Sequence, residues 1–164
     1  MTVRIRRVTT TRAGGVSAPP FDTFNLGDHV GDEPAAVEAN RARLAAAIKL
    51  PPERVIWMNQ VHGDRVEVVD EPRTEPFEDT DALVTTTPRL ALAVVTADCV
   101  PVLMGDARAG IVVGGHAGSG RGATDRVRAV FTAKLTEIRD QMTQLQVIEN
   151  DLHEALAYLD SCQS

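Results

Sequence analysis

Glycine and proline are segregated along this 164-residue chain, because all 12 glycines and all nine prolines lie within residues 1–125. Residues 126–164 contain neither, so they lack the two residue types that most strongly interrupt regular backbone structure. The first part must therefore turn often, while the second part can form one uninterrupted helix. We place the boundary at residues 123–125, which predicts two domains, 1–125 and 126–164.

Composition indicates a folded protein and argues against two classes of partner. Hydrophobic residues make up 43% and charged residues 24%, as in ordinary globular proteins. The formal charge of -6 opposes binding to nucleic-acid phosphates. No apolar run reaches the roughly 18 residues of a membrane span, and the opening MTVRIRRVTT lacks the apolar segment of a secretory signal. With only Cys99 and Cys162, we expect no disulfide framework and a reducing, cytoplasmic setting.

The first part shows signals of both helices and strands. A helix is predicted over residues 34–50, with Asp32 as N-cap, Pro34 in the first turn and a Pro-Pro pair at its end. Among the β-like runs, ALAVVT and IVV are apolar throughout, which is typical of strands covered on both faces. The predicted fold class is α+β with a long C-terminal helix. The predicted strands are Val3–Thr10, Val55–Met58, Arg65–Val69, Ala82–Thr86, Leu90–Thr96, Val100–Met104 and Ile111–Gly114.

The second part carries a heptad pattern of apolar residues over more than four heptads. Two interpretations stay open: an amphipathic helix packed on its own domain, or a coiled coil, either intermolecular or as a hairpin. The narrow seam with polar flanks favours the coiled coil, and predicts a homodimer formed through residues 131–159. One row of the seam is Phe131, Ile138, Leu145, Leu152 and Leu159; the other is Leu135, Met142 and Leu156, with Arg128 and Glu149 as polar interruptions.

Three side chains with metal-binding or nucleophilic chemistry each follow an apolar run: His62 in NQVHGD, Cys99 in TADCVP and His116 in GGHAGSGRG. Strand ends are where a sheet holds functional side chains next to adaptable loops. Two imidazoles and a thiolate suit Zn²⁺ and leave a fourth position for water or substrate. Cys99 could instead be a nucleophile with either histidine as its base. Spacings of 37 and 17 residues do not choose between these interpretations, or exclude unrelated core and loop positions.

Other polar residues are candidates for supporting or anion-binding roles. Asp98 and Asp81 could each orient an imidazole or a water molecule, or could cap a turn. Arg12, followed by Ala-Gly-Gly, and Arg121, which lies among glycines, could bind an anion. His29 could line the same cleft or belong only to its loop.

Seven of these segments occur in an order that resembles a known family: TTTRAGGVS, FNLGDHVGD, NRARL, QVHGDRV, DTDALVT, TADCVPVL and GGHAG. The family comprises proteins once labelled multicopper polyphenol oxidases or laccases and now associated with purine nucleoside phosphorolysis and adenosine deamination. The resemblance covers residues 8–122. It implies that His62, Cys99 and His116 are the metal-binding and catalytic residues, and that the fold is a layered α/β/β/α arrangement, here incomplete.

The resemblance also implies a cofactor and substrates. Zinc is the expected ion, with copper as the alternative, and the expected substrates are phosphate with adenosine, inosine or 5′-methylthioadenosine. Arg12, Arg121 and Asp98 are the candidate substrate-binding residues. The family's domain continues further than residue 122, so we expect a shortened domain, and residues from 126 weakly resemble the dimerisation helix of MerR-type regulators. The alternatives are a non-catalytic dimerisation or regulatory module and a Cys-His hydrolase.

Overall fold

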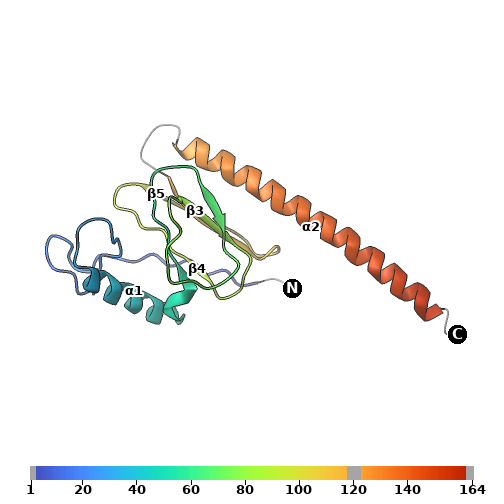
Figure 1. Ribbon diagram of the computed structural model, residues 1–164, viewed down its shortest axis with the longest axis horizontal. Coiled ribbons are helices and arrows are strands. Elements are labelled where there is room, and N and C mark those ends of the chain that lie inside the picture. Colours follow the sequence, from blue (N-terminus) through green and yellow to red (C-terminus); the bar gives the residue numbers. More distant parts are fainter. Residues whose placement is uncertain (1–2, 118–122, 162–164) are drawn as a thin grey trace. The chain divides into compact units, whose positions relative to one another are not determined.

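The structure is a computed structural model that describes residues 3–117 and 123–161. The chain forms two compact units, Met1–Thr124 and Asp125–Ser164, and each is described by itself. The first unit combines helices with β-sheet and the second is helical, so the chain has an α+β fold, as predicted (Figure 1). In chain order the elements are α1 (Pro34–Ile48), the 3-10 helix η1 (Pro52–Arg54), β1 (Val55–Ile56), β2 (Val66–Val68), β3 (Ala82–Thr85), β4 (Ala91–Leu92), β5 (Val100–Asp106), β6 (Ile111–Ala117) and α2 (Ala123–Ser161).

The strands form two sheets. β1 and β4 pair in parallel, with Val55 opposite Ala91. The larger sheet has the order β2-β3-β6-β5, in which β2 and β3 are parallel and the other pairs are antiparallel. β6 therefore lies between β3 and β5, and its burial along almost the whole strand confirms the prediction of a covered strand for the IVV run.

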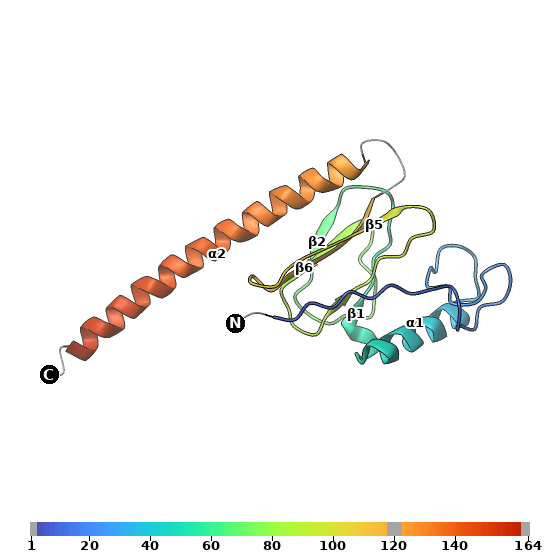
Figure 2. The same cartoon turned by 180° about the vertical axis from the view of Figure 1, so that it is seen from behind.

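Alternate residues of β1 and β4 face opposite layers, because successive side chains of a strand point to opposite sides. Val55 and Trp57 pack with Ala45 of α1, and Ala93 and Val95 join the same cluster. The residues between them pack toward the larger sheet instead, in a cluster that contains Ile56, Met58, Val69, Leu83, Leu92 and Val94. The first unit thus stacks α1, the two-stranded sheet and the four-stranded sheet as three layers (Figures 1 and 2).

Several local predictions differ from the structure. The strands predicted over Val55–Met58 and Leu90–Thr96 are regular only over Val55–Ile56 and Ala91–Leu92. Val3–Thr10 is not a strand: it runs as an extended segment whose Val3 N–H bonds to the carbonyl of Ala107. The helix begins at Pro34 as expected, but its N-cap is Glu33 rather than Asp32. Asp32 accepts a hydrogen bond from Asn25 instead, and bonds from Ser17 and Asn25 hold its pKa below the ordinary value.

Asn40 of α1 holds the loop that precedes the helix. Its side chain is 1% exposed and its Oδ1 accepts a hydrogen bond from the Val16 N–H at 3.0 Å. Its Nδ2 donates to Ser17 Oγ at 2.9 Å and to the carbonyls of Asn25 and Thr23 at 2.8 and 3.3 Å. One buried amide therefore adds four hydrogen bonds to the backbone bonds that the loop makes within itself.

Replacing Asn40 by alanine should lower the free energy of unfolding by about 1–3 kcal/mol, because partly buried backbone groups of the loop and the buried Ser17 would lose their partner. Urea denaturation followed by circular dichroism measures the change. Asn59→Ala is the matched control, since the side-chain amide of Asn59 bonds to Glu78 in an exposed pair. An Asn40→Ala protein as stable as the control would contradict this role for the amide.

The second unit is the single helix α2, which confirms the prediction of a long C-terminal helix. Among its described side chains, Met142, Leu145 and Leu152 of the heptad seam are exposed, and so are Val147 and Ile148. No helix in the described ranges has both the length and the apolar character needed to cross a membrane. Phe131, Leu156 and Leu159 of the seam lie outside the side chains that the structure describes.

Candidate metal centre

The three candidate donors come from three separate segments of the first unit. His62 lies in the loop that follows β1, Cys99 directly precedes β5, and His116 lies in β6. Register explains why the last two meet: Pro101 of β5 pairs with His116, which leaves Cys99 two residues away on the neighbouring strand. The loop after β1 joins them because the two-stranded sheet packs on the larger one.

One donor atom from each of the three residues lies within 4.8 Å of the others. The Cys99 Sγ and His62 Nε2 atoms are 3.4 Å apart, close to the roughly 3.5 Å that separates two ligands of a tetrahedral zinc ion. The imidazoles of His62 and His116 meet edge to face, with ring centroids 4.7 Å apart. This donor set fits a zinc ion, since nitrogen and sulfur are the ligands that zinc prefers.

Exposure differs among the three donors. His116 is 4% exposed, whereas Cys99 is partly exposed and His62 is exposed. Gly114, two residues before His116 on the same face of β6, makes room for the neighbouring layer, because a Cβ there would lie 3.2 Å from Val94 and 3.3 Å from Leu92. The site therefore has a closed inner side at His116 and an open side at His62 and Cys99.

The remaining predicted site residues are not equally close to the centre. Asp98 belongs to it, because its Oδ1 lies 3.7 Å from Cys99 Sγ. The Arg12 guanidinium bonds to the carbonyl of Pro20 in an exposed loop. His29 is also exposed and lies 3.7 Å from Asp28, outside the donor cluster. Arg121 lies outside the described residues.

Gln60 contributes to the centre in a way that sequence reasoning missed. Its amide pairs with both backbone groups of Val95: Nε2 donates to the carbonyl and Oε1 accepts from the N–H, each at 2.9 Å. These two hydrogen bonds to the backbone continue the pairing of β1 with β4 beyond the strands themselves. They connect the His62 loop to the segment that leads to Cys99. Its position two residues before His62 was the only available signal.

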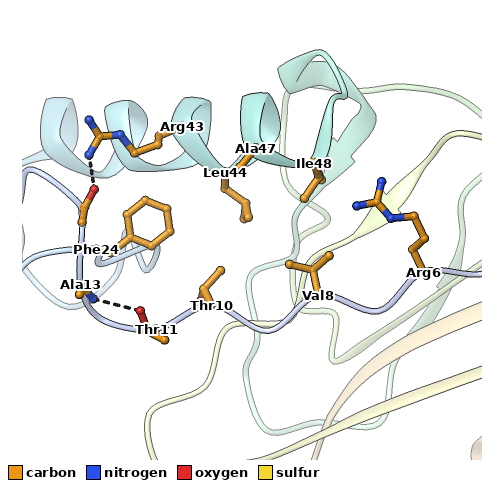
Figure 3. Close-up of a pocket in the computed structure, with 11 residues that line it drawn as sticks. Arg6, Val8, Thr10, Thr11, Ala13, Phe24, Arg43, Leu44, Ala47 and Ile48 are labelled. Carbon is orange, nitrogen blue, oxygen red and sulfur yellow. Dashed lines mark hydrogen bonds between the residues drawn. The ribbon is translucent and has the colours of Figure 1, made fainter.

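A separate pocket of about 350 Å³ lies between the N-terminal segment and α1. Figure 3 shows Arg6 and Arg43 at its two ends with Leu44 between them, and Arg43 reaches the carbonyl of Gly14. None of the three metal-donor candidates lines it. The pocket is therefore distinct from the metal centre.

The first unit has three layers and a His-Cys-His donor set at the edge of its two packed sheets. This arrangement is typical of a metal-binding protein. Residues 6–149 match the family described as multi-copper polyphenol oxidoreductase laccase, and the chain belongs to this family. The matched range includes residues 126–149, so the likeness continues into α2.

Two relatives named purine nucleoside phosphorylase are similar to most of the chain. One, from Mycobacterium tuberculosis, is 72% identical over 143 residues, which is 85% of this chain and 57% of the relative. Another, from Corynebacterium glutamicum, is 49% identical over 146 residues, 88% of this chain and 59% of the relative. The chain therefore spans little more than half the length of these relatives.

Solved structures show the same fold. YlmD from Geobacillus stearothermophilus is 38% identical, with a TM-score of 0.64 over 66% of this chain and 43% of that protein. The hypothetical protein YfiH from Bacillus licheniformis is 36% identical, with a TM-score of 0.63 over 65% of this chain and 43% of that protein. The α+β expectation and the family resemblance are thus both confirmed.

Proposed function

We propose that this chain binds one zinc ion through His62, Cys99 and His116, with copper as the alternative ion. The observation that carries the proposal is the convergence of the three donors within 4.8 Å from segments far apart in sequence. Three protein ligands leave a fourth position, which is the arrangement of catalytic rather than structural zinc. The open side at His62 and Cys99 would give a substrate access to that position.

We further propose that the site catalyses phosphorolysis of purine nucleosides such as adenosine, inosine and 5′-methylthioadenosine, together with deamination of adenosine. The names of the relatives support the phosphorylase activity. In phosphorolysis a phosphate oxygen bonds to C1′ of the ribose while the bond from C1′ to the purine nitrogen breaks. The departing purine takes up a proton. The products are the free base and ribose 1-phosphate, or 5-methylthioribose 1-phosphate when the substrate is 5′-methylthioadenosine.

The chain's own residues would bind and orient the reactants. Zinc, when bound, supplies Lewis acidity. Arg12 and Arg121 are the proposed phosphate contacts, because a guanidinium is permanently charged and can bind two oxygens at once. Asp98, beside Cys99 on the accessible side, offers a carboxylate to a substrate hydroxyl or a water molecule. His116 stays on the closed side and would hold the ion rather than contact the nucleoside.

A coupled assay tests this activity on the chain as it stands. Zinc-loaded protein is incubated with inosine and phosphate, and hypoxanthine and ribose 1-phosphate are measured by chromatography; adenosine without phosphate tests for deamination to inosine. We expect phosphate-dependent base release that Cys99→Ser abolishes and Cys162→Ser leaves intact. A zinc-loaded wild-type protein that releases no base would contradict the proposal.

The 3.4 Å contact between Cys99 Sγ and His62 Nε2 also favours a second candidate, a Cys-His hydrolase. A nucleophilic thiol needs a base at hydrogen-bond distance, and this pair provides it. Alkylation of Cys99 would then abolish activity while chelators leave it unchanged. Loss of activity on chelation, with recovery on addition of zinc, would instead support the metal enzyme.

The exposed heptad seam of α2 favours a homodimer. It would also suit the alternative function, a non-catalytic dimerisation or regulatory module. Met142, Leu145 and Leu152 lie at coiled-coil spacing and are each more than 40% exposed. Light scattering after size-exclusion chromatography should show a dimer that dissociates on dilution and that Leu145→Glu disrupts. A monomer at every concentration would contradict it.

We place the protein in a reducing, cytoplasmic setting. Cys99 is a free cysteine next to an imidazole, and a thiol of this kind serves as a metal ligand only while it stays reduced.

A further inference from the structure

Asp81 makes more contacts with the metal centre than any sequence pattern indicated. It lies directly before β3 and is 2% exposed. Its Oδ1 accepts from the His62 N–H at 2.9 Å and from His116 Nδ1 at 3.1 Å. Its Oδ2 accepts from the N–H groups of Val61 and Gly63 at 3.3 and 2.8 Å. One buried carboxylate therefore contacts both histidines of the donor set.

The backbone of the His62 loop is shaped around this carboxylate. Val61, His62 and Gly63 point three successive N–H groups at it, and His62 itself has a φ of 61°. Successive amides around a left-handed residue form a concave anion site. A non-glycine residue adopts this conformation only at an energetic cost, which the surrounding contacts must offset. Without an anion at this place the three amides would lose their common acceptor.

The same carboxylate selects one nitrogen of His116 as the donor. Because Asp81 Oδ1 can only accept, the Nδ1 atom of a neutral His116 must carry the proton, which leaves Nε2 with its free electron pair. The backbone adds a second link, since the His116 N–H bonds to the Asp81 carbonyl at 2.8 Å. With the ring 4% exposed, its orientation is fixed from both ends.

We propose that Asp81 is the positioning residue of the metal centre: it holds the His62 loop in its left-handed conformation and fixes His116 as the Nδ1–H tautomer, so that both imidazoles present Nε2 to one ion. The inference rests on the proposed metal site. Asp98 cannot take this role, because its carboxylate contacts the thiol of Cys99 and neither histidine. Acceptors behind ligating histidines orient the ring and raise the basicity of the ligand nitrogen.

The wild-type protein without metal provides the first test. Long-range proton–nitrogen NMR correlations at neutral pH identify which ring nitrogen of each histidine is protonated. We expect His116 in the Nδ1–H form, because its Nδ1 faces an oxygen that accepts hydrogen bonds. A predominantly Nε2–H form of His116 would overturn the inference. This measurement needs neither a bound ion nor a substitution, so it decides the point even if a variant fails to fold.

The second test compares Asp81→Asn with Asp64→Asn, the same change at an exposed position of the same loop. Each carboxylate oxygen of Asp81 accepts two N–H groups, and asparagine replaces one of these oxygens by an NH₂ group. Whichever way the amide is turned, its NH₂ group therefore faces two N–H donors and two hydrogen bonds are lost. We expect the zinc affinity, measured by competition with a chromophoric chelator, to fall about 10- to 100-fold for Asp81→Asn. The absorption spectrum of the cobalt-substituted protein should change as well, and Asp64→Asn should match the wild type in both.

The outcomes separate this inference from the proposed metal site. An Asp81→Asn protein that melts at a lower temperature but keeps wild-type zinc affinity and cobalt spectrum would show a purely structural residue and overturn the inference. A wild-type protein that binds no zinc would refute the metal site, and the tautomer of His116 would then decide the positioning role alone.

Discussion

Replacing Cys99 by serine should lower the zinc affinity of this chain by on the order of 100-fold or more. A thiolate supplies both negative charge and the soft sulfur that zinc prefers, whereas a serine hydroxyl stays protonated at neutral pH and binds zinc poorly. The loss should exceed the roughly 10- to 100-fold effect of removing a supporting residue, because a ligand itself is removed. Metal analysis of purified protein and competition with a chelator measure it.

Cys162→Ser is the matched control, since it changes the only other cysteine of the chain. The Cys99→Ser protein should keep the wild-type stability without metal, because the Cys99 side chain is only partly buried and follows a loop. Stoichiometric zinc in Cys99→Ser would contradict the ligand assignment. Loss of zinc in Cys162→Ser alone would point to a different site.

Cover on both faces was predictable where a run is apolar throughout, but the length of the strand was not, because β4 includes only Ala91–Leu92 of the predicted Leu90–Thr96. Leu92 and Val94 pack toward one layer while Ala93 and Val95 pack toward the other, as the apolar ALAVVT run predicted. Val3–Thr10 was wrongly predicted as a strand because its composition is β-like, yet a strand also needs a partner. Within the described residues, the backbone bond from Val3 to Ala107 does not make one. Strand pairing depends on residues that are far apart in the sequence, so a local sequence pattern does not predict it.

The convergence of the donors could be expected from residue type and family resemblance, whereas the contacts that support the donors could be expected only in part. His62, Cys99 and His116 stand out because histidine and cysteine are rare in this chain and carry chemistry. Gln60 acts through the backbone N–H and C=O of Val95, and Asp81 acts through loop amides as well as through His116 Nδ1. No side-chain pattern marks which loop amides will face a given carboxylate. The sequence indicated that Asp81 could orient an imidazole or cap a turn, but its contacts and the role of Gln60 required the structure.

Replacing Leu83 by alanine should lower the free energy of unfolding by about 2–5 kcal/mol. Leu83 is fully buried in β3 and packs between the two sheets with Ile56, Met58 and Val69. Truncation removes this apolar contact and leaves a cavity that the neighbouring strands cannot close completely. Urea denaturation of the metal-free protein measures the loss. Leu103→Ala on β5 is the control, and because Leu103 is 42% exposed its cost should stay under about 1 kcal/mol.

Adding zinc should distinguish the loss of core packing in Leu83→Ala from the loss of zinc binding in Cys99→Ser. Zinc that binds the folded state raises the free energy of unfolding by an amount that, at a given free zinc concentration, depends only on its affinity. At a free zinc concentration of 100 times Kd the gain is about 2.7 kcal/mol. Leu83 is not one of the donors, so Leu83→Ala should start lower than the wild type and gain the same increment. Cys99→Ser should start level with the wild type and gain almost nothing. Asp81 lies two residues before Leu83, directly before β3, and contacts both histidines. If Leu83→Ala also lost the increment, the cavity would have displaced this carboxylate and with it the two histidines.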